Sequence, residues 1–239
     1  MKKDEISKSI IEGAEVVDRL KHEQEIANQA WAHFLALHRS YTSKDERWKT
    51  ALDELSQFPR LAQIADALIR DTLSACFRLL DMDDRSFTLL RVQKLLSIQA
   101  VRGHRLAFFE QCKFTTRDQA VAKIDCFMSF FPAKWPVGND KQKHWPNKSE
   151  VPTDWTLADL RAELIHVRHK LIAHAGTFSK HIPIKKLDNL VKLTDQLVCS
   201  AEWIFKGSSG GSTLPHRQIE AADFWSCVEN GFINAARPS

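Results

Sequence analysis

The stretch RLAQIADALIRDTLSACFRLL, residues 60–80, decides the fold class of this chain. Its large apolar side chains recur at intervals of three to five positions, at Leu61, Ile64, Leu68, Leu73, Phe77 and Leu80. A helix of 3.6 residues per turn gathers such positions on one face, whereas a half-buried strand would need strict alternation. The stretch therefore predicts an amphipathic helix that buries one face in a helical core.

Upstream of this stretch, the same period predicts two more helices. Residues 5–40 form one long N-terminal helix in this interpretation, interrupted at most softly at Gly13. Ser43 and Glu46 make a capping-box pair, in which each side chain satisfies a free backbone N–H at a helix start. The pair predicts a second helix that stops near Pro59.

Downstream, Ser86 opens a Leu-rich helix that ends near Gly103 or continues towards Cys112. Residues 132–154 contain Pro, Lys and Trp without an apolar period, which predicts a long loop. Further helices are expected over residues 116–131, 156–176, 183–205 and 216–228.

The composition agrees with long helices. Gly and Pro number only 8 each in 239 residues, fewer than the turns of a β-rich fold would need. We therefore predict an all-α helical bundle with a long N-terminal helix and a short C-terminal helical extension. The expected organisation is one domain over residues 1–206, a Gly/Ser linker at 207–215, and a C-terminal helix and tail at 216–239.

Charge and cysteine usage suggest the compartment. A formal net charge of +4 permits contact with a polyanion without requiring it. The 5 cysteines are widely separated and contain no CxxC pair, so we expect reduced interior thiols and neither a disulfide framework nor a zinc site. The N-terminal sequence has no signal-peptide core and no stretch approaches the length of a membrane span, so a cytoplasmic protein without membrane contact is expected.

The segment TLADLRAELIHVRHKLIAHAG, residues 156–176, carries the residues of chemical interest. On a helical wheel, Arg168 lies inside a wide apolar arc, with Arg161 almost directly beneath it two turns earlier. A guanidinium cannot lose its charge, so an arginine there needs a carboxylate, a phosphate or a partner subunit. His174 lies in the last turn, at the border between the apolar arc and the polar face.

Arg168-His169-Lys170-Leu171-Ile172-Ala173-His174 resembles the signature of the HEPN superfamily, an Arg and a polar residue followed by a His after four to six intervening positions. Residues 64–96 also resemble the helix pair of the abortive-infection branch of that superfamily. The resemblance extends over about residues 60–205, and the HEPN fold is a helical bundle. Arg161 and His166 form a second, weaker match, because the polar residue after the Arg is missing.

The resemblance implies a metal-independent endoribonuclease that needs no cofactor. Such an enzyme uses the RNA's own 2′-hydroxyl and leaves a 2′,3′-cyclic phosphate. His174 would be the general acid/base and Arg168 would hold the phosphate, while His169 would position the catalytic groups. The implied assembly is a homodimer whose two copies complete one cleft.

The resemblance also implies the partners. RNA is the expected substrate, steered by Lys170 and by a run of basic residues beyond the motif. That run includes Lys180, Lys185 and Lys186. The implied setting is toxin–antitoxin or anti-phage abortive-infection defence, with an antitoxin or other regulatory protein as a further partner.

Other interpretations of the same residues remain open. Arg168 fits a core ion pair, and His174 fits a histidine favoured by the helix dipole. Glu163 and His166 have the Glu-x-x-His spacing of di-iron bundles, although the chain has no second such pair. HEPN-like bundles also serve as non-catalytic dimerisation or partner-binding modules, so this alternative stands beside the nuclease.

Overall fold

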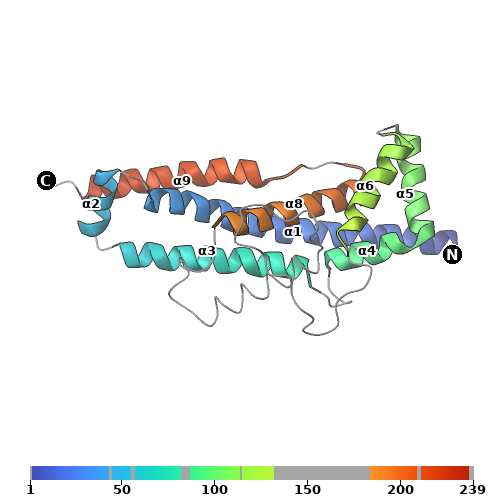
Figure 1. The fold of residues 1–239 in the computed structure, drawn as a ribbon, viewed down its shortest axis with the longest axis horizontal. Helices are drawn as coiled ribbons and strands as arrows, with labels where there is room; N and C mark the ends of the chain where they lie inside the picture. The colour runs from blue at the N-terminus through green and yellow to red at the C-terminus, as the bar shows by residue number, and fades with distance from the viewer. Residues whose placement is uncertain are drawn as a thin grey trace. The chain divides into compact units, whose positions relative to one another are not determined.

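The structure is a computed structural model, and it describes residues 2–42, 45–54, 57–81, 87–113, 115–131, 184–208 and 211–236. Within these ranges the chain forms eight helices and no strand (Figure 1). The predicted all-α fold is confirmed. The chain is poor in Gly and Pro, the residues that most often break a helix, and its described residues accordingly form long helices.

The long N-terminal helix is also confirmed. Helix α1 spans Lys3–Tyr41, with acidic Asp4 and Glu5 in its first turn and basic His38 and Arg39 in its last. Charges of these signs at these ends oppose the helix dipole and stabilise both termini. Gly13 does not interrupt the helix.

The second helix is shorter than predicted. Helix α2 spans Glu46–Glu54 and does not run on to Pro59, because that proline belongs to the next helix. Helix α3 spans Phe58–Leu79 and holds Pro59 in its first turn. Proline is favoured there because the first N–H groups of a helix have no intrahelical acceptor.

The predicted Leu-rich helix is two helices. Helix α4 spans Leu89–Ser97 and α5 spans Gln99–Cys112, and Figure 1 shows α5 turning away from α4. Ile98 breaks the run with an extended backbone, at φ −76° and ψ 108°. The helical run does continue to Cys112, which was one of the two expected ends, and the break falls at Ile98 and not at Gly103.

The remaining helices lie close to their predicted positions. Helix α6 spans Arg117–Ser129 and begins with a complete capping box between Thr116 and Gln119. Helix α8 spans Ile184–Lys206. Helix α9 spans Leu214–Ala235, so the C-terminal helix extends beyond the predicted 216–228 at both ends.

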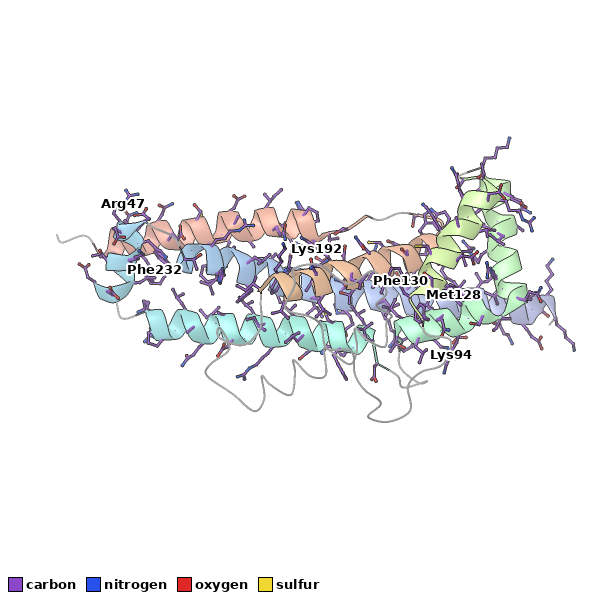
Figure 2. All side chains as sticks on the ribbon, in the orientation of Figure 1. Arg47, Lys94, Met128, Phe130, Lys192 and Phe232 are labelled. Atoms are coloured by element: carbon purple, nitrogen blue, oxygen red, sulfur yellow. The ribbon has the colours of Figure 1, made fainter. Side chains whose placement is uncertain are left out.

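The chain divides into two compact units, and each unit combines two separate stretches of the sequence. Unit 1 takes residues 1–24 and 75–212, and unit 2 takes residues 25–74 and 213–239. The core of unit 2 contains Trp48 of α2 and Trp225 of α9, together with apolar residues of α1 and α3. Trp48 also contacts Phe232 of α9, labelled in Figure 2, with 5.7 Å between ring centroids. Residues far apart in sequence therefore close this core.

Unit 1 is built from α4, α5, α6 and α8, with the first part of α1 and the end of α3. Its fully buried side chains include Leu20, Leu89, Leu96, Phe109, Ile124 and Phe127. Among the helices that the structure describes, none is both long enough and apolar enough to cross a membrane.

Candidate functional site

The residues predicted to carry the chemistry fall mostly outside the described part of the chain. Arg168, His169 and His174 lie there, as do Arg161, Glu163 and His166 of the alternative interpretations. The same holds for the predicted RNA contacts Lys170 and Lys180 and for the predicted loop 132–154. Their roles stay predictions from the sequence.

Two of the predicted RNA-binding residues lie at the start of α8. Lys185 is exposed. Lys186 belongs to the same helix, and its side chain is outside the described part of the structure. The first turns of α8 are fixed by apolar residues of its other face, because Leu187 and Leu190 are each 1% exposed. This phase directs Lys185 towards solvent.

Further along, α8 forms a partly buried ion pair with α1. Lys21 Nζ donates to Glu202 Oε1 at 2.6 Å, and the side chains are 38% and 6% exposed respectively. Glu202 Oε2 is buried and has no hydrogen-bond partner among the described residues. A carboxylate in this position depends on its single cation, since burial removes the solvation that an exposed carboxylate has.

The cysteines differ in exposure, although all five are free thiols. Cys76 is buried against Thr194 Oγ1 at 3.7 Å, and burial raises its pKa to about 12. Burial also raises the pKa of Cys199 to about 11. The expectation of interior thiols was wrong for Cys112, Cys126 and Cys227, which are exposed on their helices. A small thiol is tolerated on either face of a helix, so helical spacing does not decide its burial.

The buried arginine of α5 was not identified from the sequence. Arg105 is 4% exposed and its Nε donates to the Ile204 carbonyl oxygen at 2.7 Å. Its guanidinium also lies 4.2 Å from the centroid of the Phe108 ring, which gives a cation–π contact. Its Nη2 is buried without an acceptor among the described residues, and burial lowers the Arg105 pKa.

The sequence did contain a signal for this arginine. Arg105 lies midway between Val101 and Phe109 at helical spacing, and both neighbours are 0% exposed. An arginine at i+4 between two core residues of one face is directed into the core. Arg105 and Arg168 share this signal, since each lies among apolar positions at helical spacing.

The described residues contain no group of three His, Cys, Asp or Glu side chains placed to hold a metal ion. Comparisons of the chain with models of protein families, with curated proteins and with solved structures gave no match.

Proposed function

We propose that this chain is a metal-independent endoribonuclease of the HEPN type. The single observation that carries the proposal is the motif Arg168-His169-Lys170-Leu171-Ile172-Ala173-His174 in a segment with the period of an amphipathic helix. The confirmed all-α fold supports the proposal at the level of fold class. The roles of individual residues come from the resemblance.

The proposed reaction moves no electrons and needs only proton transfer. The ribose 2′-oxygen attacks the adjacent phosphorus, a 2′,3′-cyclic phosphate forms, and the bond to the 5′-oxygen of the next nucleotide breaks. His174 takes the proton of the 2′-hydroxyl or returns one to the leaving 5′-oxygen, a role typically worth about 10²–10⁴-fold in rate. Arg168 binds the phosphate oxygens and stabilises the charge that grows there in the transition state.

A dimer follows from the spacing of the two residues. Six positions along a helix separate Arg168 and His174 by about 9 Å of rise and turn them about 120° apart. One copy would make a loose site by itself. Two copies meeting across a two-fold axis bring both pairs into one cleft and cover the apolar arc around Arg168.

RNA binding would use the basic residues around and beyond the motif. Lys170 and Lys180 flank His174 in sequence, and Lys185 and Lys186 follow at the start of α8. The exposure of Lys185 supports this assignment, because a phosphate contact requires an accessible ammonium group. His169 would position the catalytic groups.

The proposed setting is the cytoplasm of a cell defending itself against phage, or a toxin–antitoxin pair. A ribonuclease of this kind is harmful when unrestrained, so the proposal includes an antitoxin or regulatory protein that limits its activity. Loss of catalysis would leave a dimerising or partner-binding module, and the experiment below distinguishes that outcome.

The test is incubation of the purified chain with total RNA in excess EDTA. We compare wild type with Arg168→Ala and His174→Ala, and use Arg161→Ala as the matched control because it alters only the weaker motif match. Wild type and the control are expected to cleave and to leave cyclic-phosphate ends. Each motif variant is expected to lose at least about 100-fold in rate.

Three results would contradict the proposal. Cleavage abolished by EDTA would direct attention to Glu163 and His166 as metal ligands. Cleavage lost only in Arg161→Ala would make the second motif match the active one. RNA left intact by a wild-type chain that is dimeric in solution and freed of any co-purified partner would favour the non-catalytic module.

A further inference from the structure

A cleft of about 240 Å³ lies between α6 and α8 within unit 1, and we call it the α6–α8 cleft. Two of its lining residues are cysteines, Cys126 of α6 and Cys199 of α8. Phe130, a further lining residue, is labelled just after the end of α6 in Figure 2. The two helices therefore present one thiol each to the same small space.

A side-chain contact already joins the two helices at this cleft. The Lys123 ammonium lies 4.2 Å from the centroid of the Trp203 ring, and both residues line the cleft. Cys126 follows Lys123 by about one turn of α6, and Cys199 precedes Trp203 by about one turn of α8. Residues one turn apart on a helix face have Cβ atoms about 5–6 Å apart. Both thiols therefore lie next to an existing contact between the helices.

The helices on both sides of the cleft are held by core packing. Trp203 stacks on Phe109, with 4.1 Å between ring centroids, and Phe109 is 0% exposed. On α6, Phe127 follows Cys126 directly and is 2% exposed. Packed helices have axes about 8–10 Å apart, and a disulfide joins residues whose Cα atoms lie within about 7 Å. Cysteines on the facing sides of two packed helices satisfy that limit without a change of fold.

The two thiols differ in accessibility and in acidity. Cys126 is exposed, whereas Cys199 is half-buried. Burial, followed by the nearby carboxylates of Asp195 and Glu202, raises the pKa of Cys199 to about 11. The Lys21 ammonium acts in the opposite direction but does not offset them. Cys199 is therefore protonated at neutral pH, and an oxidant from solution reaches Cys126 first.

We propose that Cys126 and Cys199 form a reversible disulfide when hydrogen peroxide reaches the α6–α8 cleft, and that this bond is a redox switch of unit 1. The Cys126 sulfur attacks one peroxide oxygen, the O–O bond breaks, and Cys126 becomes a sulfenic acid while water leaves. The Cys199 sulfur then attacks the Cys126 sulfur, the S–S bond forms, and a second water leaves. The two thiols lose two protons and two electrons in total, and the peroxide takes up both.

The disulfide would close a loop of the chain between residues 126 and 199. The Arg168–His174 motif falls within this stretch of the sequence, so oxidation would fasten both ends of the stretch that contains it. Disulfides of cytoplasmic proteins are mostly transient and redox-sensing, which agrees with a reversible bond. Its formation does not depend on the proposed RNA cleavage, so the failure of either proposal leaves the other standing.

The choice of partner distinguishes the folded cleft from random oxidation. Cys112 is also exposed, but it ends α5, whereas Cys126 lies roughly 14 Å along the axis of α6 from the start of that helix. This separation exceeds the Cα distance that a disulfide spans. In an unfolded chain the preference reverses, because the loop between Cys112 and Cys126 is much shorter than the loop between Cys126 and Cys199.

The experiment treats the reduced full chain with hydrogen peroxide, in buffer and in concentrated urea, and maps the disulfides by mass spectrometry of unreduced peptides. In buffer, Cys126–Cys199 is expected to be the main disulfide, and dithiothreitol should reverse it. In urea, Cys112–Cys126 should replace it. A folded chain that forms mainly Cys112–Cys126, only disulfides between two chains, or no disulfide would overturn the proposal.

Two variants and a stability measurement complete the test. Cys199→Ser is expected to abolish the cross-link and to leave Cys126 as a sulfenic acid that dimedone labels. Cys112→Ser is the matched control and should form Cys126–Cys199 in the wild-type yield. The oxidised wild type is expected to melt about 5–10 °C above its reduced form, a rise that peroxide should not produce in Cys199→Ser. A melting temperature that is unchanged or lower in the oxidised wild type would mean that the folded cleft does not accommodate the bond.

Discussion

The two units of this protein bury different kinds of side chain. In unit 2, no charged side chain of the described residues is buried, and the core is apolar around Trp48 and Trp225. In unit 1, Arg105, Asp195 and Glu202 are all at most 5% exposed. Unit 2 gains its stability from apolar area, whereas unit 1 also depends on matching buried charges.

Unit 2 has a cluster of charged contacts at the start of α9, where the side chains remain partly exposed. Thr213 donates to Glu25 at 2.6 Å and accepts from Asn28 at 3.0 Å, and Arg217 pairs with Glu25 and Glu220. These contacts fix where α9 begins without burying a charge. Ion pairs with this much exposure contribute little each, typically below about 1 kcal/mol. The apolar core should therefore dominate the stability of unit 2.

The largest expected effect is in the apolar core of unit 2. Trp48→Ala should lower the free energy of unfolding by about 3–5 kcal/mol, because Trp48 is 2% exposed and its removal leaves a cavity. The measurement is urea unfolding followed by circular dichroism.

A pair of milder variants separates packing from hydrogen bonding. Trp48 Nε1 donates to the Ser40 carbonyl at 2.8 Å, whereas Trp225 Nε1 is buried without an acceptor among the described residues. Trp48→Phe should therefore cost about 1 kcal/mol more than Trp225→Phe. Equal costs would show that the Trp48 hydrogen bond contributes nothing.

The next effect is in the charged core of unit 1. Lys21→Met should destabilise the protein by about 1–3 kcal/mol, because it leaves the Glu202 carboxylate buried without its cation. The double variant Lys21→Met with Glu202→Leu should recover most of the loss, since no unpaired charge remains. A double variant as unstable as Lys21→Met would mean that packing, and not charge, limits this site.

Alkaline pH should also affect unit 1 through a buried thiol. The folded-state pKa of Cys76 is raised to about 12 from an ordinary value of 9.0, so above pH 9.0 the unfolded chain loses a proton that the folded chain keeps. Its stabilising contribution is therefore complete below pH 9.0 and declines as the pH rises towards 12. The free energy of unfolding should fall by up to about 1.4 kcal/mol for each pH unit in this range.

Cys76→Ala tests this origin of the alkaline slope. The difference in unfolding free energy between wild type and the variant should shrink between pH 9 and pH 11. Cys227→Ala is the control from unit 2, because that thiol is exposed. A difference between wild type and Cys76→Ala that is constant over this range would rule out thiol ionisation as the cause.

The last comparison takes one glycine from each unit, and Gly231 gives the smallest expected effect. A Cβ at Gly13 of α1 would overlap the ring of Phe205, which is 3% exposed and cannot move aside easily. Gly13→Ala should therefore cost about 1–3 kcal/mol in spite of the better helix propensity of Ala. Gly231 of α9 has open space around it, so Gly231→Ala should stabilise by about 0.5–1 kcal/mol. Thermal unfolding of both variants is the measurement, and the melting temperature should fall for Gly13→Ala and rise for Gly231→Ala.

The sequence predicted which segments are helical better than where they end. The period of apolar residues was correct for α1, α3, α6 and α8, because an amphipathic helix repeats its signal over many turns. The break at Ile98 was missed, because no Gly or Pro marks it in the sequence. Pro59 was assigned to the end of a helix although it begins one, because proline is compatible with either position.

The candidate sites differ in the same way. The Arg168–His174 motif could be identified because both residues fall within one short stretch of sequence, and its assignment stays a prediction. The α6–α8 cleft was not readable, since Lys123 and Trp203 come together only when two distant helices pack. The burial of Arg105 could have been predicted from its spacing to Phe109. Its hydrogen-bond acceptor, a backbone carbonyl of α8, could not.

The sequence by itself determined the all-α fold, the long N-terminal helix and the residues of the proposed nuclease motif, because each depends on spacing within one segment. Only the tertiary structure decided that residues 25–74 and 213–239 share one unit, and that Lys123 and Trp203 line one cleft. The physical reason is that helical period fixes which face of a helix is apolar, whereas the partner of that face is chosen by side-chain shape and charge across the whole chain.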